Sequence, residues 1–321
     1  MNPKSLLSLI YPGAFVLAFS PSVSFGAANT SAIPAVVLPS SNQPADIDQT
    51  ITNSKVRAEL GSKSKWSVRN TLTYQGGTMN TPLDEARPDY RSASLDTTNA
   101  VYFTGEVATK YGLMNGDSLN LGVGITVLKP FNRTIEEATS RNSNFNISTP
   151  FIEYNKAYKV GSVQMVSTGK FYYATEKNDV DVIGKFGVIR LTQTFLQEIG
   201  TRLTGGLQFI ADTNIYKNSD SVYLAEGSKS EIPRNNNIIG AFPYAEYAFN
   251  DRYAVRTVFG LFQFKNTLAD YTYRQLEPYQ SLGVGISLSR DFYLYPNLQF
   301  APKDIRADRT NVGLTANINL F

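Results

Sequence analysis

The sequence predicts an all-β fold whose strands close into an antiparallel up-and-down barrel. Three observations support this prediction. Segments that alternate between apolar and polar residues recur through the chain, their connections alternate between short and long, and the one extended apolar stretch lies at the N-terminus. Successive side chains of a β-strand point to opposite faces, so alternation over ~10 residues builds a sheet with one apolar and one polar face.

Twelve segments carry this alternation. They are expected at residues 65–75, 99–110, 118–128, 147–156, 162–173, 181–195, 201–213, 238–249, 253–265, 280–288, 292–301 and 310–321. The fourth changes phase, and the sixth is ambiguous near Lys185 and Arg190, which indicates a β-bulge. Pro243 and Pro296 fall inside strands, so they must lie at bulges or the expected boundaries are wrong there.

The connections between these segments are sorted by length. Five are short, near 111–117, 157–161, 196–200, 250–252 and 289–291, and three are long, near 76–98, 129–146 and 214–237. Short and long connections alternate along the chain, with intermediate ones in the remaining positions. This order is typical of a barrel that crosses a membrane with short turns on one side and long loops on the other.

The N-terminal region predicts export. Lys4 precedes an apolar stretch at 6–19 and small residues at 24–26, which is the pattern of a signal peptide cleaved after Gly26. The apolar stretch is shorter than the ~20 residues that a membrane-spanning helix needs. Residues 1–26 are therefore expected to be a signal peptide and residues 65–321 the barrel. Residues 27–64 are either a flexible periplasmic extension or a segment that enters and plugs the pore.

Composition argues against several classes of function. The chain has 321 residues and a net charge of +3, with no dense Lys/Arg run, so nucleic acid is not an expected partner. It contains no Cys and no His, which removes thiolate nucleophiles, disulfides and the commonest general base and metal ligand. No catalytic residue, metal site or cofactor is predicted, and the protein is not expected to be an enzyme.

Charged residues on the polar face are the candidate pore-lining groups that would set selectivity. They are Arg69, Glu106, Lys170, Arg202, Asp212, Glu246 and Arg256. A three-residue turn at 250–252 would place Glu246 directly opposite Arg256. Two interpretations are open: ion pairs that rigidify the wall, or a surplus of basic groups that gives weak anion selectivity. Tyr102, Tyr244, Tyr293 and Tyr295 also face the lumen, where they either fill a narrow barrel or form a sugar-binding track.

Strand pattern, loop alternation, signal peptide and the terminal Phe321 together resemble porin-like outer-membrane β-barrels of Gram-negative bacteria. The resemblance covers residues 65–321. It implies location in the cell outer membrane, contact with outer-membrane lipid, and recognition of the C-terminal strand ending in Phe321 by the barrel-assembly machinery. The resemblance is to an architecture and implies no substrate. The function we expect of this barrel is a passive channel for small hydrophilic (polar) solutes.

Two other functions fit the same architecture. One is a non-conducting outer-membrane surface protein whose external loops bind a partner. The other is an autotransporter translocator, which the sequence favours less.

Overall fold

The computed structural model describes residues 47–89, 98–113, 116–131, 145–176, 178–217, 234–267 and 272–321. The expected signal peptide and most of residues 27–64 lie outside the described residues, as does much of each long connection. None of the helices among the described residues is long and apolar enough to span a membrane.

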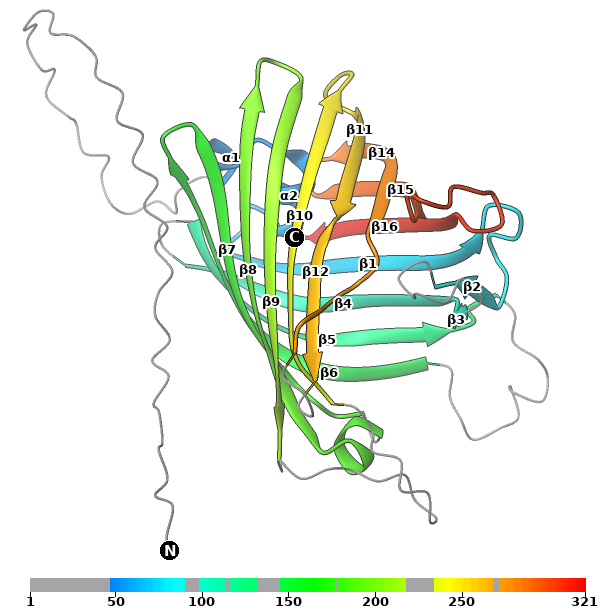
Figure 1. Ribbon diagram of the computed structural model, residues 1–321. Helices are drawn as coiled ribbons and strands as arrows, with labels where there is room; N and C mark the ends of the chain where they lie inside the picture. The colour runs from blue at the N-terminus through cyan, green and yellow to red at the C-terminus, as the bar shows by residue number, and fades with distance from the viewer. Residues whose placement is uncertain are drawn as a thin grey trace, which may run out of the picture. The chain divides into compact units, whose positions relative to one another are not determined.

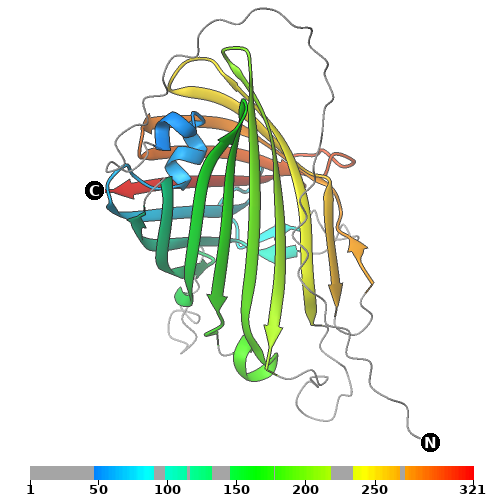
Figure 2. The same cartoon turned by 90° about the vertical axis from the view of Figure 1, so that its left-hand side faces the viewer.

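Twelve antiparallel strands form a closed barrel, as the sequence predicts (Figures 1 and 2). In order around the wall they are β1 (Trp66–Thr78), β4 (Tyr102–Gly112), β5 (Asp117–Leu128), β6 (Phe145–Val160), β7 (Val163–Tyr173), β8 (Lys185–Ile199), β9 (Leu203–Tyr216), β10 (Asn235–Ala248), β11 with β12 (Tyr253–Gly260 and Phe262–Thr267), β14 (Tyr279–Ser289), β15 (Phe292–Phe300) and β16 (Asn311–Leu320). Pairing of β16 with β1 and of β10 with β11 closes the ring. Three short strands lie outside it: β2 (Ala86–Pro88), β3 (Thr98–Ala100) and β13 (Arg274–Gln275).

The irregular strands have identifiable causes. In the fourth expected strand, β6, the register against β5 shifts between Gly122 and Gly124, and Thr149 has a φ of 49°. This β-bulge reverses the phase of the alternation. In the sixth, β8, the register shifts between Lys185 and Gly187, which confirms the predicted bulge.

The two prolines lie where the hydrogen-bond ladder is interrupted. Pro243 pairs regularly with β9, and on its other side the partner strand breaks at Leu261, between β11 and β12. Pro296 pairs with β16, while the ladder from β15 to β14 lapses beside it without a register shift. Pro243 therefore lies at a bulge and Pro296 at a gap, and in neither place is the missing N–H needed.

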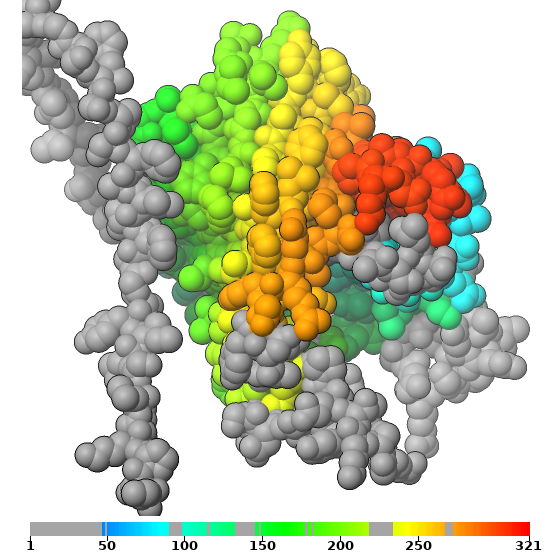
Figure 3. Space-filling model, viewed as in Figure 1, coloured from blue at the N-terminus to red at the C-terminus, as the bar shows by residue number. Residues whose placement is uncertain are grey.

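Short turns join the strands at one end of the barrel. Gly161 and Gly200 have φ values of 61° and 70° there, a conformation that favours glycine. The turn at 250–252 brings Glu246 opposite Arg256, as the sequence predicts. At the other end, Met79 donates a backbone hydrogen bond to Thr310 (2.9 Å), and the connection between β15 and β16 (red) lies beside the β1–β2 region (cyan) in Figure 3.

Burial on the wall is the reverse of that in a soluble protein. Outward-facing Leu121 and Leu191 are 57% and 58% exposed, whereas inward-facing Asn120 and Glu153 are 0% and 4% exposed. Charged residues are almost never fully buried in soluble proteins unless they are paired. An apolar exterior around a polar interior is the arrangement of a membrane-spanning barrel.

Two short helices occupy the barrel interior at the end with the short turns (Figure 2). They are α1 (Ile47–Thr50) and α2 (Ser54–Glu59). Asn53 caps α2 by accepting a hydrogen bond from the backbone N–H of Val56, which satisfies an otherwise unpaired donor. Residues 47–63, which contain both helices, are called the luminal segment below.

Candidate pore and its luminal segment

A network of ion pairs runs along the inner wall through six strands. We call it the wall network; its members are Arg69, Glu106, Glu153, Lys170, Arg190 and Asp212. Arg69 binds both carboxylate oxygens of Glu153, at 2.7 and 3.0 Å. Lys170 bridges Glu153 (3.0 Å) and Glu106 (2.5 Å). Two-point guanidinium–carboxylate pairs hold both partners in one geometry, which favours a rigid wall.

The network continues through a tyrosine to the next strands. The hydroxyl of Tyr172 donates to Glu106 (3.0 Å) and accepts from Arg190 (3.3 Å). Arg190 binds both oxygens of Asp212, each at 2.7 Å. Each charged member thus has a partner of opposite charge within the network.

A second group of polar residues lies where the luminal segment meets β10, β11 and β15. We call it the central cluster; its members are Asn53, Tyr244, Glu246, Arg256 and Tyr293. Glu246 accepts from Asn53 Nδ2 (2.7 Å) and from Arg256 Nη1 (3.0 Å). The guanidinium of Arg256 lies 4.1 Å from the ring centroid of Tyr244, a cation–π distance. The cluster therefore joins the wall to the luminal segment.

Glycines on neighbouring strands make room for the tyrosine rings of the central cluster. A Cβ at Gly206 would lie 2.1 Å from Cζ of Tyr244, and one at Gly285 would lie 2.4 Å from the hydroxyl of Tyr293. Both rings therefore lie along the wall, which leaves space beside α2 that upright rings would fill.

The luminal segment is held to the wall by both apolar and polar contacts. Ile51 is fully buried, in a cluster with Leu196 and Tyr244 of the wall. Gln164 accepts from the Thr52 N–H (2.9 Å) and donates to the Thr52 hydroxyl (2.7 Å). At the C-terminal end of the segment, Ser62 donates to the carbonyl of Phe321 (2.5 Å).

Asp48 provides the main ionic contact of the luminal segment. It pairs with Arg290, in the turn between β14 and β15 (2.9 Å), and with Lys63 (3.1 Å). Burial by itself raises the pKa of Asp48, but the hydrogen bonds and attraction from Arg290 and Lys63 outweigh it. The pKa therefore lies below its ordinary value.

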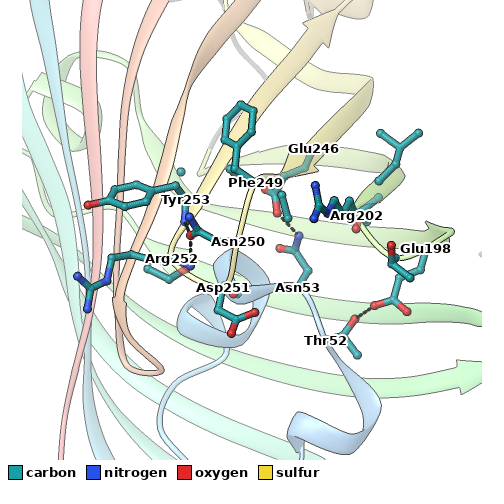
Figure 4. Close-up of a pocket in the computed structure, with 18 of the residues that line it drawn as sticks. Thr52, Asn53, Glu198, Arg202, Glu246, Phe249, Asn250, Asp251, Arg252 and Tyr253 are labelled. Atoms are coloured by element: carbon teal, nitrogen blue, oxygen red, sulfur yellow. Dashed lines mark hydrogen bonds between the residues drawn. The ribbon is translucent and has the colours of Figure 1, made fainter.

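Two cavities lie on either side of α2. The mouth cavity, of about 930 Å³, opens among the short turns and includes Arg202, Glu246 and Tyr293 in its lining (Figure 4). The inner cavity, of about 270 Å³, is lined by Tyr244 and Arg256 among others.

The boundary between the cavities follows from the order of inward residues on two strands. On β11, Ala254 lines the mouth cavity, and Arg256 and Val258 line the inner one. On β10, Glu246 lines the mouth cavity and Tyr244 the inner one. The Glu246–Arg256 pair therefore separates the two cavities.

Six of the seven predicted pore-lining residues lie on the inner wall, and the predicted position of Glu246 opposite Arg256 is found. Four of the six belong to the wall network: Arg69, Glu106, Lys170 and Asp212. The other two, Glu246 and Arg256, pair with each other in the central cluster. Arg202 was expected in a strand, but β9 begins at Leu203, so Arg202 lies exposed in the turn and lines the mouth cavity.

Two residues of the wall network, Glu153 and Arg190, were missed by the sequence prediction. Both lie in strands whose phase is changed by a bulge, at Thr149 and at 185–187. When alternate residues are counted from the short-turn end of each strand, where the alternation is unbroken, both side chains fall on the face toward the lumen. This count could have identified both residues as lumen-facing from the sequence.

No family model and no curated protein matches the chain. Among solved structures, the chain is similar to an outer-membrane channel from Pseudomonas putida F1, with 12% identity, 81% of this chain and 97% of that chain covered, and a TM-score of 0.49. It is similar to the NanC porin, with 11% identity, 78% and 97% covered, and a TM-score of 0.42. It is also similar to the translocator domain of the autotransporter NalP from Neisseria meningitidis, with 10% identity, 80% and 88% covered, and a TM-score of 0.37.

The predicted architecture, a closed antiparallel barrel of twelve strands, is confirmed. Because the identities and TM-scores are low, its function has to be argued from this chain's own residues.

Proposed function

We propose that this protein is a passive channel of the outer membrane for small hydrophilic solutes, and that residues 47–63 narrow its lumen. The observation that carries the proposal is the pair of cavities on the two sides of α2, inside a wall with an apolar exterior. The mouth cavity has a mainly polar lining, and the inner cavity a mixed one. Polar groups along a lumen stabilise water and hydrated solutes there, as in porins.

The contacts of the luminal segment favour a narrowed rather than a filled lumen. The segment contributes two helices of four and six residues, and its apolar contacts are made by Ile47, Ile51, Val56 and Leu60. Many of its other contacts are hydrogen bonds and ion pairs, which water can replace. The cavities beside α2 show that the docked segment leaves part of the lumen open.

Charge around the two cavities supports a weak anion preference. Three basic residues line the mouth cavity, Arg57, Arg202 and Arg252, and three acidic residues there balance them. The inner cavity adds three basic residues against two acidic ones, so the two linings together carry one excess positive charge. Within the wall network, acids and bases are equal in number, so this network contributes to rigidity more than to selectivity. The expected preference is small because the groups at the mouth are screened by salt.

Single-channel recording in planar bilayers tests the proposal. The refolded chain should give small, sustained current steps, and a variant lacking residues 27–64 should give larger steps. Far-UV circular dichroism checks that both variants are folded β-barrels. Reversal potentials in a salt gradient measure the anion preference.

Silence from both folded proteins would contradict a channel. It would favour the alternative, a surface protein anchored by the barrel whose external loops bind a partner. Recognition of the C-terminal strand by the barrel-assembly machinery remains part of the proposal, and Phe321, 85% exposed at the end of β16, is the residue to substitute in testing it.

A further inference from the structure

The inner cavity contains a buried cation whose hydrogen bonds are incompletely used. Arg256 is 5% exposed, and its Nη1 binds Glu246. Its Nε has no hydrogen-bond partner among the described residues. A buried charged donor without an acceptor is costly, and an anionic oxygen is the acceptor that satisfies a guanidinium best.

The other charges around the inner cavity are already matched. Arg69 binds Glu153 through two contacts, and Lys55 binds Glu59 within α2. The acid that partners Arg256, Glu246, lies on the mouth-cavity side. Arg256 is therefore the lining base whose acid partner lies outside the inner cavity, and it gives that cavity a local positive charge.

The rest of the lining is suited to hydroxyl groups. Thr192, Thr194 and Gln208 contribute side-chain donors and acceptors, and Phe242 and Tyr244 contribute ring surface for C–H groups. A cavity of about 270 Å³ is slightly below the usual range for drug-sized ligands, so it fits a small one.

We infer that the inner cavity binds a small hydroxylated carboxylate, with its carboxylate on Arg256, and that this is the solute class that the channel carries. Only the statement that the channel carries this class of solute rests on the proposed channel function; binding in the inner cavity does not. Since Arg256 lies at the boundary between the cavities, a carboxylate entering from the inner cavity reaches Arg256 before it reaches Glu246. Binding and passage would then involve the same residue.

Gluconate is a suitable probe, with glucose as the uncharged analogue and glucosamine as the cationic one. Binding is measured by isothermal titration calorimetry on the full chain in detergent micelles, and as concentration-dependent block of single-channel current. Gluconate should bind and block, while glucose and glucosamine should bind at least about 10-fold more weakly.

Variants at the Glu246–Arg256 pair give effects of opposite sign. Arg256→Gln should weaken gluconate binding about 10-fold or more, and Arg256→Lys should weaken it too because lysine lacks Nε and the planar fork. Glu246→Gln should strengthen gluconate binding, since it removes the acid that competes for Arg256. A merely structural role for the pair would weaken binding in all three variants. Arg306→Gln removes the same charge in the β15–β16 connection and should leave binding unchanged.

Equal binding of gluconate and glucose, or full gluconate binding by folded Arg256→Gln, would overturn the inference. The two proposals fail separately. Gluconate binding in micelles without any current would remove the channel and keep the site. Current without gluconate binding or block would keep the channel and remove the site.

Discussion

The wall network and the central cluster both place charges inside the barrel, but they satisfy them differently. In the wall network, Arg69 and Arg190 each bind both oxygens of one carboxylate. In the central cluster, Arg256 makes one contact to Glu246, and the other oxygen of Glu246 bonds to Asn53 of the luminal segment. The first group is held by two-point contacts that fix the shape of the wall, whereas the second leaves Nε of Arg256 without a hydrogen-bond partner among the described residues.

The largest expected effect is on stability, in the wall network. Glu153→Gln leaves Arg69 without its carboxylate partner in a nearly fully buried position. Removing one partner of a buried ion pair costs about 3–5 kcal/mol in the free energy of unfolding. Urea titration of the protein refolded in lipid vesicles measures this loss.

Glu246→Gln is the matched change in the central cluster. The glutamine amide can still accept from Asn53, and Arg256 has a cavity beside it, so the loss should be less than half as large. Equal losses in the two variants would show that the two groups do not differ in the way described.

The next largest loss of stability is expected where the Tyr244 ring packs against Gly206. Gly206→Ala places a methyl group 2.1 Å from that ring and should push it into the inner cavity, with a stability loss of about 1–3 kcal/mol. Gly205→Ala is the control, because its nearest atom is Cδ1 of Ile199 at 3.5 Å, an ordinary contact. Gluconate titration of the two folded variants should show weaker binding only for Gly206→Ala; unchanged binding would place the ring outside the site.

A smaller effect is expected from the ionic contact of the luminal segment. Asp48→Asn should weaken docking by about 1 kcal/mol, the scale of one net hydrogen bond. Ile51→Cys, introduced into this cysteine-free chain, reports docking through its protection from a thiol reagent at pH 7. Asp48→Asn should speed its modification about 5-fold. Asp291→Asn, which removes the other acid on Arg290, should not; equal rates would argue against Asp48.

Docking of the luminal segment should depend on pH with a definite sign. Since the pKa of docked Asp48 lies below its ordinary value of about 3.9, its contribution is complete at neutral pH and is lost as the pH falls through the lowered pKa. Conductance should therefore stay constant from pH 7 to about 4 and rise below that. The rise should be absent in Asp48→Asn.

The smallest effect is expected at the exposed mouth. Arg202→Gln should shift the reversal potential toward cations at 0.1 M salt, where charges act over ~10 Å, and not at 1 M, where they act over ~3 Å. A shift that persists at 1 M salt would mean that Arg202 lies in a narrow part of the path.

Regular strands could be predicted from the sequence because side-chain alternation is local. That alternation predicts that Lys170, Asp212 and Arg256 face the lumen. It also predicts that Glu246 pairs with Arg256 across a three-residue turn. Glu153 and Arg190 were missed because the sequence indicates that the alternation changes phase in their strands but not the residue at which it changes.

The contacts of the luminal segment could not be predicted for a different reason. Helices of four and six residues are too short to show a clear 3.6-residue period. Their positions depend on partners far away in sequence, such as Arg290 for Asp48 and Glu246 for Asn53.

Solutes are expected to pass beside α2, from the inner cavity to the mouth cavity past Arg256. Single-channel current during thiol modification of Val258→Cys and Ala254→Cys, which bracket Arg256 on β11, tests it directly. Conductance should fall when a charged thiol reagent reaches Val258→Cys from the long-loop side or Ala254→Cys from the short-turn side. Leu196→Cys, fully buried against the luminal segment, should be unaffected. Loss of current at Leu196→Cys with none at the two β11 positions would contradict the account.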